Sequence, residues 1–108
     1  MRKSGSYDCP VEATLDVIGG KWKAVVLSHL LTEKTLRFGQ LRKLIPKATQ
    51  QMLTLQLREL ENSGVIHRKV FAQVPPKVEY SLTDFGKSLG PIINQMKKWG
   101  TQYMEIKK

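Results

Sequence analysis

The sequence lacks the residues that build covalent or metal-based chemistry. Its 108 residues include one cysteine, Cys9, and two histidines, so no intrachain disulfide can form and no Cys/His set has zinc-ligand spacing. The apolar runs are far shorter than the ~20 residues that span a bilayer, and no apolar run follows the first cations. We therefore expect a cytoplasmic location, no metal, no cofactor and no membrane partner.

Acidic residues are scarce relative to basic ones. Eighteen Lys and Arg stand against nine Asp and Glu, a formal net charge of +9, which favours an anionic partner such as nucleic acid. The excess is uneven, because between residues 21 and 47 a single acid, Glu33, accompanies seven cations: Lys21, Lys23, Lys34, Arg37, Arg42, Lys43 and Lys47. A solvated basic face would have the same composition, so charge by itself leaves both interpretations open.

Apolar spacing and helix-stop residues predict two helices in the first third of the chain. Residues 1–8 form a polar arm that we expect to be mobile. Cys9-Pro10 opens the first helix, because proline suits the first helical turn, and Gly19-Gly20 ends it. Its expected buried face consists of Val11, Leu15 and Ile18. A second helix follows over about residues 22–31, with these residues inward: Val25, Val26, Leu30 and Leu31.

The next segments have the order of a helix-turn-helix. Residues 35–38 favour a lone strand, and residues 38–44 a third helix that Pro46 stops. Thr49 can cap a fourth helix, which ends at residues 62–64. The apolar positions of the third and fourth helices predict these core residues: Phe38, Leu41, Leu44, Ile45, Met52, Leu53, Leu57 and Leu60. The opposite face of the fourth helix presents Gln50, Gln51, Thr54, Leu55 and Arg58.

Two strands and an apolar helical segment follow. Residues 65–71 and 77–82 favour strand, so they predict a hairpin with a proline-containing tip. Thr83-Asp84 caps a helical segment that Gly90-Pro91 kinks or restarts. Its apolar residues recur at alternating steps of four and three: Phe85, Leu89, Ile92, Met96, Trp99 and Tyr103. We expect residues 83–108 to be a dimerisation helix within a single domain over residues 1–108.

A helix pair followed by a basic hairpin is typical of a winged helix-turn-helix, an α+β fold that is mainly α. Its second helix lies in the major groove, where Gln50 and Gln51 suit an adenine edge and Leu55 a thymine methyl group. Arg58 suits a phosphate or a guanine. The hairpin, or wing, offers Arg68, Lys69 and Lys77. Because strand alternation points Arg68 and Lys69 to opposite faces, we expect only one of those two to contact DNA.

The sequence resembles the HxlR-type branch of MarR-like winged-helix transcriptional regulators over about residues 9–103. The resemblance is carried by Cys9-Pro10-Val11, Gly19-Gly20-Lys21-Trp22, Arg37-Phe38, Met52-Leu53-Thr54, Leu57-Arg58-Glu59-Leu60 and residues 74–83. It implies a bacterial homodimer that binds an inverted repeat, with terminal helices pairing the subunits. It also implies a reading helix over residues 49–63 and places Lys21 and Lys23 near the DNA backbone.

The predicted contacts with double-stranded DNA combine these arguments. They are Thr49, Gln50, Gln51, Thr54, Leu55 and Arg58 on the reading helix, Lys21, Lys23 and Arg37 in the basic segment, and Arg68 and Lys77 in the hairpin. A solvated turn remains the other interpretation for each of Lys21 and Lys23.

Cys9 carries a second expectation. A helix N-terminus favours a thiolate, the form in which cysteine reacts with oxidants, and some regulators of the resembled family sense oxidants or electrophiles with a cysteine here. With no second cysteine, a redox switch would use an intersubunit disulfide or a small-thiol adduct. A small apolar residue beside the dimer helices is the alternative.

Three classes of function follow from these observations. The first is a sequence-specific DNA-binding regulator acting as a homodimer. The second is a nonspecific architectural or RNA-binding module, which the nearly neutral reading helix disfavours, because Glu59 and Glu61 offset Arg58. The third, a thiol enzyme, lacks a base, since neither His29 nor His67 has an evident path to Cys9. We therefore expect no enzyme, and the sequence identifies no small-molecule effector.

Overall fold

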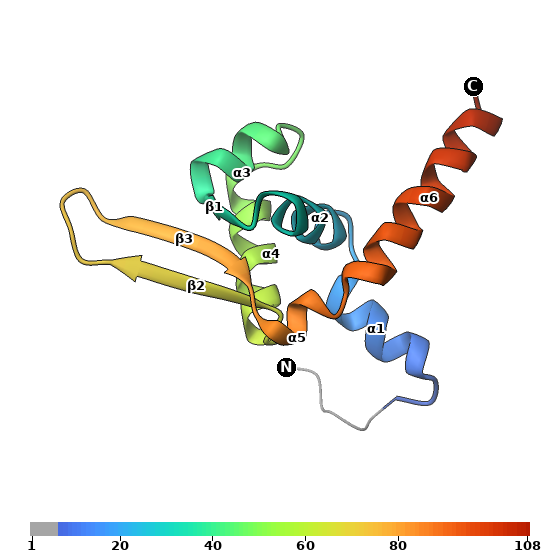
Figure 1. Ribbon diagram of the computed structural model, residues 1–108, viewed down its shortest axis with the longest axis horizontal. Helices are drawn as coiled ribbons and strands as arrows, with labels where there is room; N and C mark the ends of the chain where they lie inside the picture. Colours follow the sequence, from blue (N-terminus) through green and yellow to red (C-terminus); the bar gives the residue numbers. More distant parts are fainter. Residues whose placement is uncertain (1–6) are drawn as a thin grey trace.

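The computed structural model describes residues 7–108 and shows a mainly helical α+β fold (Figure 1). Its elements follow in the order α1 (Pro10–Ile18), α2 (Lys23–Glu33), β1 (Thr35–Arg37), α3 (Phe38–Leu44), α4 (Gln50–Asn62), β2 (Ile66–Phe71), β3 (Lys77–Leu82), α5 (Asp84–Lys87) and α6 (Gly90–Ile106). The β2–β3 hairpin projects from one side of the helices, and α6 projects from the other. The expected mobile arm falls mostly on residues 1–6, which lie outside the described residues.

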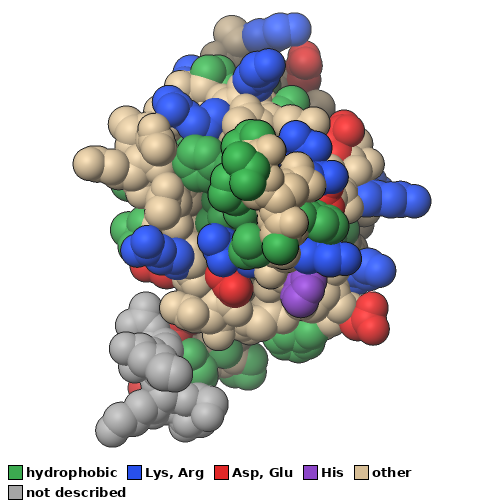
Figure 2. Space-filling model, turned by 90° about the vertical axis from the view of Figure 1, so that its left-hand side faces the viewer, with side chains coloured by type: hydrophobic (Ala, Val, Ile, Leu, Met, Phe, Trp, Pro, Cys, Tyr) green, Lys and Arg blue, Asp and Glu red, His purple; other side chains and the backbone are tan. Residues whose placement is uncertain are grey.

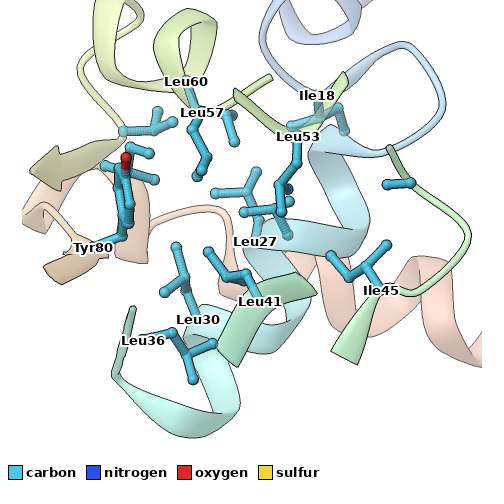
Figure 3. Packing of buried hydrophobic residues seen from close by; sticks show 14 of the residues in the cluster. Ile18, Leu27, Leu30, Leu36, Leu41, Ile45, Leu53, Leu57, Leu60 and Tyr80 are labelled. Atoms are coloured by element: carbon cyan, nitrogen blue, oxygen red, sulfur yellow. The ribbon is translucent and has the colours of Figure 1, made fainter. Parts of the chain in front are cut away.

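The core lies where α2, α3 and α4 meet. Figure 3 shows Leu27, Leu41 and Leu53, one from each helix, directed into the same cluster. Leu27 is fully buried, although it is absent from the inward face predicted for the second helix. This cluster fixes α4 against the rest of the chain and leaves its opposite face free.

The sheet has three antiparallel strands in the order β1-β3-β2. The prediction that residues 35–38 form a lone strand is therefore wrong, because β1 pairs with β3 and Leu36 lies opposite Tyr80. Both of these side chains are buried. A strand of three residues carries little pattern of its own, and its partner lies more than forty positions away along the chain.

Two threonines cap helices as the sequence predicts. Thr49 Oγ1 accepts a hydrogen bond from the Met52 N–H at 3.1 Å at the start of α4. Thr83 Oγ1 accepts from the Gly86 N–H at 2.9 Å and donates to the Gly64 carbonyl oxygen at 2.7 Å. Because Gly64 follows α4, the second threonine ties the end of α4 to the start of α5.

Four residues expected in the core are exposed in the chain: Val11, Leu15, Leu44 and Met52. On α1 only Ile18 of the predicted face is buried, while Val11 and Leu15 are 61% and 57% exposed. Apolar periodicity identifies a face of a helix but not what covers it. Within the described residues, the outer face of α1 has no covering element.

Candidate nucleic-acid interface

The face of α4 that points away from the core is polar and shallowly hollowed. The residues that line this hollow are Thr49, Gln50, Gln51, Thr54, Leu55 and Arg58, the same residues that the sequence predicts as DNA contacts on the fourth helix. We call this set the reading face. Leu55 is 47% exposed within it, so an apolar side chain stands among hydrogen-bonding ones, a mixture that suits base edges carrying both polar groups and methyl groups.

The reading face continues toward the hairpin. A second hollow is lined by Thr54, Leu57, Arg58 and Glu61 of α4 together with Arg68 of β2 and Tyr80 of β3. Thr54 and Arg58 belong to both hollows. The structure therefore brings Arg68 into one surface with the reading face.

The two faces of the hairpin differ in their polar contacts. Arg68 pairs with Tyr80 and Lys69 with Glu79, so Arg68 and Lys69 point to opposite faces, as strand alternation predicts. Lys69 Nζ and Lys77 Nζ lie 4.9 and 4.7 Å from the centre of the Phe71 ring, and Lys77 Nζ lies 3.2 Å from Glu79 Oε2. Lys77 is thus held by an acid and a ring on the face away from Arg68.

The hairpin end of the molecule is predominantly basic. Figure 2 looks onto this end and shows Lys and Arg side chains on all sides of a hydrophobic patch. Such a distribution attracts a polyanion while leaving apolar surface for close contact.

The predicted phosphate contacts in the basic segment fall in three different environments. Lys21 is exposed, with its Nζ 5.1 Å from the centre of the Trp22 ring. Arg37 is also exposed at the end of β1, and its backbone N–H donates to Gln40 Oε1 at 2.8 Å. Lys23, by contrast, pairs with Glu59 Oε1 at 2.8 Å, and its side chain is only 12% exposed. Lys23 therefore differs from Lys21 and Arg37 in having an acidic partner and little exposed surface, and its role as a phosphate contact stays a prediction.

Arg42 is a residue of this surface that is absent from the predicted DNA contacts. Its Nη1 donates to Gln50 Oε1 at 3.4 Å, which joins α3 to the reading face. Because the Gln50 oxygen is engaged, its amide N–H groups remain to face a ligand. The sequence could have indicated Arg42, because it is one of the seven cations between residues 21 and 47 and lies eight residues before Gln50.

The residues predicted for dimerisation lie on or near a helix that extends away from the core. Phe85, Ile92, Met96, Trp99 and Tyr103 are exposed, whereas Leu89 is half-buried against the core. The Trp99 and Tyr103 rings stack with their centres 5.5 Å apart. On α1 and α6, four further exposed large apolar residues lie outside the predicted interface: Val11, Leu15, Met104 and Ile106.

Cys9 is exposed immediately before α1. Its carbonyl oxygen accepts a hydrogen bond from the Glu12 N–H at 2.8 Å, while its side chain makes no capping hydrogen bond. Among residues 7–108 there is no cluster of three His, Cys, Asp or Glu side chains that could hold a metal ion. No helix in the described part of the chain is long and apolar enough to cross a bilayer.

The helix pair α3–α4 and the hairpin that follows it define a winged helix-turn-helix protein. Residues 17–108 match the HxlR-like helix-turn-helix family, and the chain belongs to that family. It is therefore a helix-turn-helix transcriptional regulator and not an enzyme.

Relatives and solved structures agree with this assignment. The chain is 65% identical over 97 residues to the HTH-type transcriptional regulator YdeP of Bacillus subtilis, covering 90% of this chain and 75% of YdeP. The redox regulator HypR in its reduced form superposes with a TM-score of 0.86 at 56% identity, covering 91% of this chain and 96% of HypR. Reduced YodB from B. subtilis superposes with a TM-score of 0.74 at 32% identity, covering 90% of this chain and 95% of YodB.

Proposed function

We propose that the protein is a sequence-specific regulator that binds an inverted-repeat operator as a homodimer. The observation that carries the proposal is the reading face, whose amide, hydroxyl, methyl and guanidinium groups project from one helix beside a basic wing. Gln50 and Gln51 offer the hydrogen-bonding groups that distinguish an adenine edge, and Arg58 suits guanine or phosphate.

The apolar surface of α6 supports a second copy of this chain as its partner. Ile92, Met96 and Tyr103 are each roughly half exposed, and Trp99 more so. Contiguous apolar surface of this kind is typical of an interface between proteins. Two-fold pairing through it would place two reading helices on successive major grooves, ~34 Å apart.

A footprint on the DNA flanking the gene, followed by genome-wide binding, tests this function. We expect a protected inverted repeat, with affinity at moderate salt at least ~10³-fold above that for random duplex. Equal affinity and equal salt dependence for the two duplexes would favour the nonspecific architectural or RNA-binding alternative.

We further propose that Cys9 makes operator binding responsive to oxidants or electrophiles. The support is its exposure at the start of α1 and the similarity to structures described as redox regulators, HypR and YodB. Two thiols, Cys9 with its counterpart in the second subunit or with a small thiol, would lose two protons and two electrons to the oxidant and form one disulfide.

The test of the redox proposal is operator affinity before and after treatment with diamide. We expect a loss of affinity in the wild type, reversal by a reductant, and no change in Cys9→Ser. An equal response of the wild type and Cys9→Ser would remove Cys9 from the mechanism.

A further inference from the structure

The contacts of Lys23 join three helices. Lys23 begins α2, its Nζ lies 2.8 Å from Glu59 Oε1 on α4, and it donates to the Asp16 carbonyl oxygen of α1 at 3.4 Å. The hydrogen bond to α1 is partly buried, and the Lys23 side chain is 12% exposed. One ammonium group therefore connects α1 to the reading helix.

The Lys23 ammonium group provides a partner for a backbone carbonyl of α1 and for a carboxylate of α4. The last four carbonyl groups of a helix lack partners within it, and Asp16 lies in the last turn of α1, which ends at Ile18. An ammonium group has three donors, so Lys23 can serve this carbonyl and the Glu59 carboxylate together. Glu59 directly follows Arg58 of the reading face, and a displacement of this ion pair would displace the face as well.

The same segments also lie near each other one helical turn from Glu59. Gly20, in the turn between α1 and α2, has φ +86°, and a Cβ atom there would lie 3.8 Å from Gln56 Oε1. That oxygen is buried and has no hydrogen-bond partner among the described residues. Gln56 and Glu59 are three residues apart and share one flank of α4. The α1–α2 turn and the start of α2 therefore lie along this flank, with the Lys23–Glu59 ion pair as the polar contact between them.

We propose that Lys23 is a positioning residue for DNA recognition, which acts through Glu59 to hold the reading helix at a fixed orientation relative to α1. This inference rests on the proposed function, because operator binding is its readout. A recognition surface must be held to within about half an ångström to match its target. A dimer presents two copies of α4 at once, so a change in α4 orientation would misalign both.

The experiment compares Lys23→Met and Glu59→Gln with the wild type, by fluorescence anisotropy on the footprinted operator at several salt concentrations. We expect each variant to lose about tenfold in operator affinity with an unchanged salt slope, and the double variant to lose no more than either single one. Removal of an acid close to DNA raises the affinity on electrostatic grounds alone. A loss of affinity in Glu59→Gln would therefore have the sign that positioning predicts and that electrostatics does not.

Lys21→Met is the matched control, because Lys21 lies two residues before Lys23, is exposed, and makes no ion pair among the described residues. If Lys21 neutralises a phosphate, its replacement lowers the magnitude of the salt slope by about 0.9. Lys23→Arg, which keeps a donor for Glu59, should retain most of the operator affinity. Urea denaturation verifies that each variant is folded. If Lys23→Met does not fold, the comparison of the two single variants Glu59→Gln and Lys23→Arg tests the proposal.

Two results would overturn the proposal. A lower salt slope in Lys23→Met together with a higher affinity in Glu59→Gln would make Lys23 a phosphate contact that Glu59 restrains. Wild-type affinity in both variants would show that the ion pair has no part in recognition. A failure of the proposed function is distinct from both, since the wild type would then show no preference for the operator over random duplex.

Discussion

The helices α4 and α6, which lie toward the two ends of the molecule, differ in where their apolar side chains go. On α4, Leu53, Leu57 and Leu60 are buried in the chain's own core, and the outward face is mainly polar, with Arg68 of the basic hairpin beside it. Along α6 only Ile93 of the large apolar side chains is fully buried, while Trp99 is 65% exposed. The first surface suits a hydrated polyanion and the second an apolar partner. This difference is why we assign DNA to one end and a second copy of the chain to the other.

A short junction joins the two ends. The Thr83 N–H donates to the Val65 carbonyl oxygen at 3.1 Å, and Thr83 Oγ1 donates to the Gly64 carbonyl oxygen at 2.7 Å. The end of α4 is therefore hydrogen-bonded to the entrance of α5 and α6. We expect this junction, with the Lys23 ion pair, to transmit the geometry of a dimer to the two reading faces.

Met96→Asp should give the largest effect, because it places a charge on the apolar surface of α6 and leaves the reading face unchanged. Each subunit would bring an unpaired carboxylate into an apolar interface, at a cost of about 4 kcal/mol in dimerisation, or about a thousandfold in the dimer constant. Sedimentation should show monomers with an unchanged circular dichroism spectrum, and operator affinity should fall with dimerisation.

Asn94→Asp is the matched control for Met96→Asp. It adds the same charge to an exposed position on the opposite side of α6 and should leave the dimer intact. A Met96→Asp protein that stays dimeric would place the subunit interface elsewhere.

The elements are predictable because each carries a local signal, whereas the misassigned contacts depend on the tertiary fold. The Thr49 cap, the polar face of α4 and the hairpin all follow from patterns within about a dozen residues. The resemblance places Lys23 near the DNA backbone, but the sequence gives no sign of its partner, Glu59, which lies on a helix that only the tertiary fold brings near. The partner of β1 is distant along the chain for the same reason. Val11 and Leu15 satisfy the pattern of a core face because periodicity does not distinguish a core from an interface.

Gly86→Ala tests how closely the junction packs between the two ends. A Cβ atom at Gly86 would lie 1.9 Å from the Val65 carbonyl oxygen, so the backbones of α5 and the α4–β2 turn would have to separate. We expect the free energy of unfolding to fall by about 3 kcal/mol, measured by urea denaturation. Gly39→Ala, where a Cβ atom would meet nothing within 4 Å, should cause no such loss. Equal stabilities of the two variants would contradict a tight junction.

Gln51→Ala tests the hairpin end alone and should have the smallest effect of the three. Gln51 lies on the reading face, and loss of its contacts with a base should cost about 2 kcal/mol on the operator, with little change on random duplex. Because no charge is removed, the salt slope should stay at its wild-type value. Gln102→Ala, the same substitution at an exposed position of α6, should leave both affinities unchanged. If Gln51→Ala weakens operator and random duplex equally, Gln51 does not read a base, and sequence preference must come from other residues of the reading face or from the wing.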